Sequence, residues 1–309
     1  MFDHFAYSVL VAPVLVLLVT WPLADRLRPA FAARVFAWSA VAAAVCTTTN
    51  VVAFALKALA ELPVVAGWGG WSAEVVKADT AHVPWATGLS VVWFAVSVVA
   101  VLLGWRRYRA SLRGAWEEVD HLDAGEGEGD EVVVVPDDRV DAFALPGRPD
   151  AEGRVVVTTG LRDALSERQY AAVLAHERAH LDGGHHQLVW FTRLAAYAQP
   201  LLWPLVKKVA YLVERAADEE AARVTGSRAD VARAIAHAAL AVNGAGPSAR
   251  PPGLLAMSSG VVPRRMAAMT GPEVRRRWLL GMPVLLAAST IVWTGECAYD
   301  FYELLAYRR

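Results

Sequence analysis

The chain has 309 residues, of which 56% are hydrophobic and 20% are charged, and its formal net charge is −1. The apolar share exceeds that of ordinary soluble domains and indicates a membrane protein that also carries a polar portion. A net charge near zero gives no support to direct nucleic-acid binding, and two cysteines, Cys46 and Cys297, exclude a disulfide framework.

Apolar runs near the N-terminus are long enough to span a bilayer. They cover about residues 5–24, 36–59 and 85–105. Basic residues follow the first and the third run, whereas the 61–84 loop contains a single lysine, so the positive-inside rule places the N-terminus outside and the segment after residue 105 inside. A last run at 278–293 follows a basic triplet and is expected to return the C-terminus to the outside.

The polar portion, 106–278, is expected to form a cytoplasmic domain between a membrane region with three transmembrane helices, 1–105, and a C-terminal segment, 279–309, with a transmembrane helix and a short tail. Valine-rich runs at 132–135 and 154–159 are typical of buried strands. The sequence therefore predicts a mainly α-helical membrane protein that carries an α+β domain with a small sheet.

Two segments of the polar portion are harder to interpret. Residues 117–131 are acidic and rich in glycine, which predicts a surface loop. Residues 187–210 are apolar, but Pro200 and Pro204 divide them into pieces too short to span a bilayer comfortably. We expect a helical hairpin packed on the preceding helix, followed by a further helix over 209–224, and a fourth membrane helix is the alternative.

A helix that begins with a capping-box pattern at Ser166 contains the sequence His-Glu-Arg-Ala-His. Its two histidines, His176 and His180, are four residues apart, lie on one face of the helix and can bind one zinc ion together. Glu177 is then placed to take a proton from the attacking water and is the candidate catalytic base. Two ordinary surface histidines are the alternative, because such patterns also arise by chance in alanine-rich helices.

A zinc hydrolase needs a third protein ligand, and Glu214 in a downstream helix is our candidate. Asp218 follows one turn later on the same face and is expected to hold a ligating histidine in its tautomer. A solvated acidic helix is the alternative, because two further glutamates follow. His185 and His186 are rival third ligands, which we interpret as helix-end or surface residues, with an assisting role at the site left open.

These motifs resemble the integral-membrane zinc metallopeptidases of family M56, the BlaR/MecR-type signal-transducing proteases, and more distantly family M48, the HtpX-like proteases. The resemblance rests on residues 141–147, 155–161 and 173–180 and on the Glu214–Asp218 pair. It implies a gluzincin-type peptidase domain with one zinc ion per chain, bound by His176, His180 and Glu214, and with Glu177 as general base. It also implies a strand that holds the substrate peptide in extended form by edge pairing. That strand consists of Ala142, Phe143, Ala144 and Leu145.

The resemblance further implies a membrane-embedded metalloendopeptidase that cleaves a cytosolic protein, such as a transcriptional repressor, in regulatory signalling. No penicillin-binding sensor domain is expected, because few residues follow the last apolar run. An HtpX-like quality-control protease and a non-catalytic, zinc-bound membrane signalling protein are the alternatives. The expected partners are a protein or peptide substrate and the lipid bilayer, with the catalytic domain in the cytoplasm and both termini outside, and a homodimer is left open.

Overall fold

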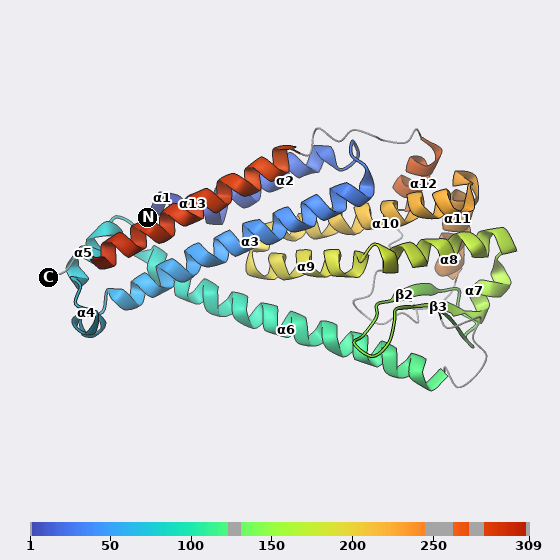
Figure 1. The fold of residues 1–309 in the computed structure, drawn as a ribbon, viewed down its shortest axis with the longest axis horizontal. Helices are drawn as coiled ribbons and strands as arrows, with labels where there is room; N and C mark the ends of the chain where they lie inside the picture. The colour runs from blue at the N-terminus through green and yellow to red at the C-terminus, as the bar shows by residue number, and fades with distance from the viewer. Residues whose placement is uncertain (1, 123–130, 245–261, 272–280, 307–309) are drawn as a thin grey trace.

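The computed structural model describes residues 2–122, 131–244, 262–271 and 281–306. Within these ranges the chain is mostly helical, with a three-stranded sheet at one end of an elongated helical bundle (Figure 1). The predicted fold class, a mainly α-helical membrane protein with a small sheet, is confirmed.

Three helices in the described ranges are long and apolar enough to cross a membrane. The first is continuous from Phe2 to Leu23 and consists of α1 (Phe2–Ala6), the π-helical turn η1 (Tyr7–Val11) and α2 (Ala12–Leu23). The others are α3 (Pro29–Ala60) and α6 (Trp85–Leu122). They match the first three predicted spans. The C-terminal helix α13 (Gly281–Ala306) is not among the three, and the start of the run at 278–293 lies outside the described residues, so the last span stays a prediction.

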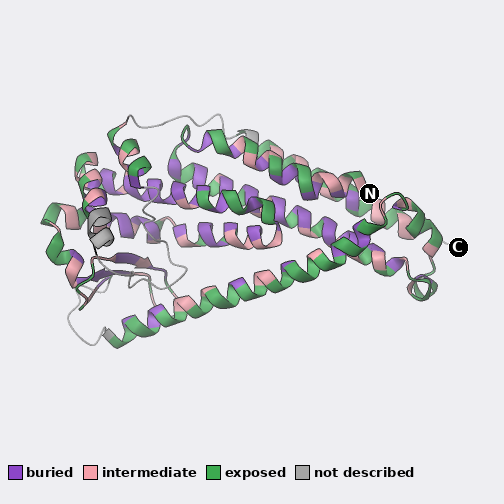
Figure 2. Cartoon of the chain, turned by 180° about the vertical axis from the view of Figure 1, so that it is seen from behind, coloured by how far each residue is buried: buried purple, intermediate pink, exposed green. Residues whose placement is uncertain are grey.

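The central helix of the bundle is α3, which contacts α6, α9, α10 and α13. Its buried face is rich in alanine, and small side chains allow neighbouring helices to approach closely. Figure 2 shows that α3 is largely buried, whereas α6 on the flank is mostly exposed. The exposed residues of α6 include large apolar ones such as Val92, Val96 and Leu102, as a lipid-facing helix requires.

The connection between α3 and α6 is helical. It contains α4 (Pro63–Gly69) and α5 (Ala73–Asp79), where the sequence suggests only a loop. Lys57 of α3 holds this connection, because its ammonium group is buried and bonds Glu61 at 2.8 Å and Thr80 at 2.7 Å.

The sheet contains β1 (Val132–Val135), β2 (Ala142–Leu145) and β3 (Arg154–Thr158) in the order β1-β3-β2. β1 runs parallel to β3, and β2 pairs with β3 in antiparallel register with Phe143 opposite Val156. β2 is therefore an edge strand. The short helix α7 (Thr159–Ala164) leads from β3 into α8 (Glu167–Asp182).

The predicted surface loop over 117–131 is wrong for its first part, because α6 continues to Leu122. The reason is tertiary packing: Trp116 and Val119 of α6 are buried against the sheet, and Trp116 Nε1 donates a hydrogen bond to the Pro146 carbonyl at 3.1 Å. Residues 123–130 of that prediction lie outside the described residues.

The segment after α8 is a helical hairpin, as predicted. It consists of α9 (His185–Ala198), the 3-10 turn η2 (Pro200–Leu202) and α10 (Trp203–Thr225). The predicted helix at 209–224 is not separate, because Pro204 stands in the first turn of α10, where proline is tolerated, and the helix continues unbroken. α11 (Arg228–Gly244) and α12 (Val262–Thr270) follow.

The hairpin shares one hydrophobic core with the membrane helices α2 and α3, which includes Phe36, Leu205 and Leu212. Its tip is also bonded to the first membrane helix. Gln199 Nε2 at the tip donates to the Val9 carbonyl at 2.8 Å. Beside it, Thr47 Oγ1 of α3 donates to the Ser8 carbonyl at 2.9 Å. Both carbonyls belong to η1, so these two bonds connect the π-helical turn to the hairpin and to α3.

The boundaries proposed at residues 105 and 278 stay a prediction, and α6 passes residue 105 without interruption.

Candidate metal centre

The helix α8 presents its two histidines to α10. It begins with a capping box between Ser166 and Gln169, which sets the residue at which the helix starts. The buried positions then recur every three or four residues and include Ala172, His176 and His180. Because α8 packs against α10, this face meets the part of α10 that carries Glu214.

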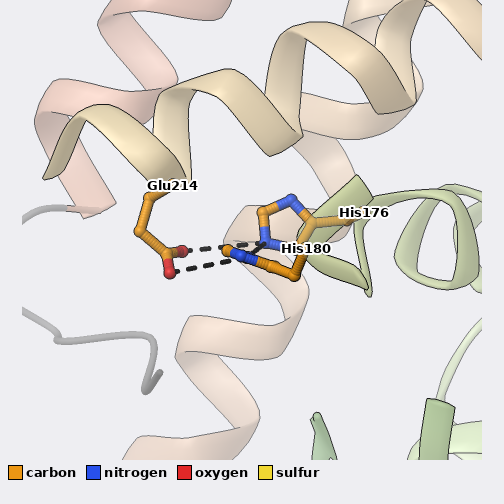
Figure 3. A group of neighbouring side chains, drawn as sticks. All are labelled: His176, His180 and Glu214. Carbon is orange, nitrogen blue, oxygen red and sulfur yellow. Dashed lines mark hydrogen bonds and ion pairs between the residues drawn. The ribbon is translucent and has the colours of Figure 1, made fainter. Parts of the chain in front are cut away.

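Three buried side chains converge between these helices (Figure 3). Their ligand atoms, from His176, His180 and Glu214, all lie within 4.8 Å of one another. The Nε2 atoms of the two histidines are 3.1 Å apart. Glu214 Oε2 lies 3.7 Å from His176 Nε2, and Glu214 Oε1 lies 3.6 Å from His180 Nε2. Ligands at 2.0–2.1 Å from one tetrahedral zinc ion are about 3.3 Å apart, so this donor set fits zinc in both chemistry and spacing.

Asp218 lies behind the first histidine. Its Oδ1 is 3.1 Å from His176 Nδ1, and its side chain is fully buried. If this nitrogen donates its proton to the carboxylate, Nε2 is left as the free ligand atom. The structure thus brings Asp218 to the place that the Glu214–Asp218 spacing suggests.

Arg265 of α12 also reaches the centre, although no motif in the sequence indicates it. Its guanidinium group is fully buried, bonds Asp218 through Nε at 2.8 Å and Nη2 at 2.6 Å, and places Nη1 2.8 Å from Glu214 Oε2. Burial opposes the charge of Glu214, but Arg265 and the histidines outweigh burial and hold the pKa of Glu214 well below its ordinary value. Burial also opposes the charge of Asp218, but Arg265 and His176 outweigh burial and lower its pKa. Both carboxylates are therefore charged at neutral pH.

His185, the first residue of α9, is buried behind the second histidine. Its Nδ1 lies 3.0 Å from His180 Nδ1. The interpretation of His185 as a helix-end residue is confirmed, but its ring is not at the surface. Among the described residues, Glu214 completes the metal-binding group, and neither His185 nor His186 belongs to it.

The other candidate residues lie on α8, β2 and α10. Glu177 is buried on α8 between the two histidines, and β2, with Ala142, Phe143, Ala144 and Leu145, packs against α8. Tyr211 and Arg215 are also buried, on α10. Arg223 is exposed at the end of α10 and bonds Glu220.

Comparison with known proteins supports a protease. The family model "Peptidase family M48" matches residues 119–192, which include the sheet, α8 and most of the first hairpin helix. A "Protease HtpX homolog" of Bordetella petrii is 33% identical over 105 residues, which are 33% of this chain and 35% of that protein. Another of Bordetella pertussis is 34% identical over 109 residues, which are 35% of this chain and 36% of that protein. No solved structure matches.

These matches cover only part of the chain, and they all name M48 or HtpX-type proteases. The matching segment spans about a third of the length of the curated relatives. The residues that the family model matches, 119–192, contain His176, Glu177 and His180 and end before Glu214. The similarity is to M48 and HtpX-type proteases, so the order of the two family resemblances is reversed: M48, taken as the more distant, is the family whose model matches, rather than M56.

Proposed function

We propose that this protein is a membrane-embedded zinc metalloendopeptidase of the M48 type. The observation that carries the proposal is the convergence of His176, His180 and Glu214, with ligand atoms within 4.8 Å of one another, on helices that also contain a buried Glu177. The match to "Peptidase family M48" and to HtpX homologs supports the same chemistry.

Each residue of the centre has a separate role in the proposed peptide hydrolysis. His176, His180 and Glu214 hold the ion, which when bound supplies Lewis-acid chemistry to the carbonyl and the attacking water. Glu177 takes the proton from the water and then gives it to the leaving amine. Asp218 and Arg265 keep the ligand side chains oriented and the carboxylates charged.

The substrate is proposed to be a protein segment near the inner membrane surface. The edge strand β2 offers main-chain pairing to an extended peptide beside α8. The arginines that follow the first and the third predicted span favour a cytoplasmic centre with the N-terminus outside. The similarity to HtpX homologs favours cleavage of membrane proteins, in a quality-control role, over cleavage of a transcriptional repressor.

The test is Glu177→Gln in the full chain, purified in detergent. We expect the variant to retain one zinc ion and to cleave casein about 10²–10⁴-fold more slowly, because general base catalysis is lost. Glu167→Gln, at an exposed glutamate in the first turn of the same helix, is the matched control and should cleave like the wild type. If Glu177→Gln cleaves at the wild-type rate, Glu177 is not the general base and the proposal is wrong; if zinc is bound but neither protein cleaves, a zinc-bound signalling protein becomes the better description.

A further inference from the structure

The two histidines of the metal-binding group have different supports. His176 faces a carboxylate through Nδ1, with Asp218 Oδ1 at 3.1 Å. His180 faces another imidazole, with His185 Nδ1 at 3.0 Å from its own Nδ1. The rings of His180 and His185 stand nearly perpendicular, at an interplanar angle of 85°, and both are buried.

We propose that His185 is a positioning residue that holds His180 as a metal ligand. This inference rests on the proposed function, because it assigns Nε2 of His180 to the metal. A neutral imidazole that binds through Nε2 carries its proton on Nδ1, and His180 Nδ1 then donates to His185 Nδ1. His185 must therefore be neutral with its proton on Nε2, since a charged ring would set two N–H groups against each other.

The turn between α8 and α9 is built to place this ring. Gly184 has φ +58°, a left-handed conformation that favours glycine, and it directs the chain so that α9 begins at His185. Gly183 has an ordinary helical φ of −77°, so its backbone does not require glycine. However, a Cβ atom at Gly183 would lie only 2.4 Å from His185 Nε2. The absence of a side chain at position 183 thus makes room for the imidazole of His185.

The arrangement predicts which replacements of His185 are tolerated. Asparagine has an amide oxygen close to the position of Nδ1, so it can accept the hydrogen bond from His180. Leucine has nearly the shape of asparagine but no acceptor. Aspartate supplies a charged acceptor, which raises the basicity of the ligating histidine further. Zinc affinity should therefore follow the acceptor at position 185 rather than the size of the side chain.

The experiment compares His185→Asn with His185→Leu in the full chain. Zinc affinity is measured by competition with a chelator, and Co²⁺ replaces zinc for an absorption spectrum that reports ligand geometry. We expect His185→Leu to weaken zinc binding about 10–100-fold and to alter the Co²⁺ spectrum. The zinc affinity of His185→Asn and His185→Asp should be at most about threefold lower than that of the wild type, or higher than it. His237→Leu, at an exposed histidine near Gln169, is the matched control and should change neither.

The outcomes separate this inference from the proposed function. If His185→Asn and His185→Leu weaken zinc equally, or if a folded His185→Leu binds zinc like the wild type, His185 does not position His180. If the wild type binds no zinc, or if His176→Ala binds it undiminished, the metallopeptidase proposal fails and the inference fails with it. Gly183→Ala provides a second variant should His185→Leu not fold, since it crowds the ring without removing it. An unchanged zinc affinity in that variant also contradicts the inference.

Discussion

Arg265 and Asp218 form a bidentate ion pair inside the protein, with Nε and Nη2 of the arginine at 2.8 and 2.6 Å from the two carboxylate oxygens. Both side chains have 0% exposure. The same guanidinium group lies 2.8 Å from Glu214 Oε2. Arg265 therefore balances the charge of two carboxylates on α10 and links α12 directly to the metal-binding group.

Replacement of Arg265 by methionine should be strongly destabilising. It leaves two carboxylates buried without their cation, and breaking a buried pair by removing one partner costs about 3–5 kcal/mol. Arg264→Met is the matched control, because Arg264 pairs with Asp25 where both side chains are about half exposed, and such pairs contribute at most about 1 kcal/mol. Unfolding of both variants in detergent with graded denaturant measures the difference. Equal losses would show that Arg265 is not the cation on which the centre depends.

The stability of the metal-free protein should be greatest near pH 6.5. Burial opposes the charge of His176, but hydrogen bonds to Asp218 and Glu214 outweigh burial and raise its pKa to about 9. A raised histidine pKa contributes stability that is fully present below 6.5 and is lost as the pH rises through 9. Burial and the nearby His176 lower the pKa of His185 to about 4, so its contribution is present above 6.5 and is lost as the pH falls toward 4.

Thermal unfolding in a chelator between pH 4 and pH 9 checks this prediction. His176→Gln should abolish the loss of stability on the alkaline side and leave the loss on the acid side. The zinc-loaded protein should not lose stability between pH 6.5 and 9, because a ligating histidine carries no proton on the bound nitrogen. A metal-free protein that becomes more stable from pH 6.5 to 9 would contradict the assigned direction of the His176 shift.

The parts of the centre that the sequence could predict are those that depend on local geometry. His176 and His180 share a face because the helix period places residues four apart on one side, whatever the rest of the fold does. The pairing of Glu214 with Asp218 follows from the same rule. The valine runs of β1 and β3 are equally local, since β-branched side chains favour strands at short range.

The parts that could not be predicted depend on contacts between distant segments. Arg265 is 47 positions from Asp218, and no spacing rule connects them. His185 is polar and stands at a helix end, and only the packing of α9 against α8 buries it. At the acidic end of α6, Trp116 and Val119 pack on the sheet, a contact that the acidic, glycine-rich composition of 117–131 does not indicate. In each case a tertiary contact overrides a weak local preference.

Gln199 at the tip of the hairpin should stabilise the whole bundle. Its Nε2 donates to the Val9 carbonyl at 2.8 Å and to Thr47 Oγ1 at 3.2 Å, and its side chain is fully buried. Gln199→Met has a similar length but removes both donated hydrogen bonds from the buried interior, which should cost about 1–3 kcal/mol. Gln187→Met, at an exposed glutamine of the preceding helix α9, should change stability by at most about 0.5 kcal/mol. Unfolding in mixed micelles of graded SDS content compares the two, and equal stabilities would exclude this role for Gln199.

The edge strand β2 gives a test of substrate binding that leaves the metal ligands intact. Thr158 N donates to the Asp141 carbonyl at 3.0 Å, so the hydrogen-bonded positions of this antiparallel ladder alternate from Asp141, and the main-chain groups of Ala144 point away from β3. Proline at position 144 removes an outward N–H group and is tolerated on an edge strand.

If β2 pairs with an extended substrate, Ala144→Pro should lower kcat/KM about tenfold through the loss of one intermolecular hydrogen bond. Zinc affinity should be unchanged, because residue 144 is not part of the metal-binding group. Ala144→Val retains the N–H group and should cleave at nearly the wild-type rate, which separates the hydrogen bond from a change of side chain. A proline variant that binds zinc and cleaves casein like the wild type would remove β2 from the substrate site and leave the peptidase chemistry at His176, Glu177 and His180 unaffected.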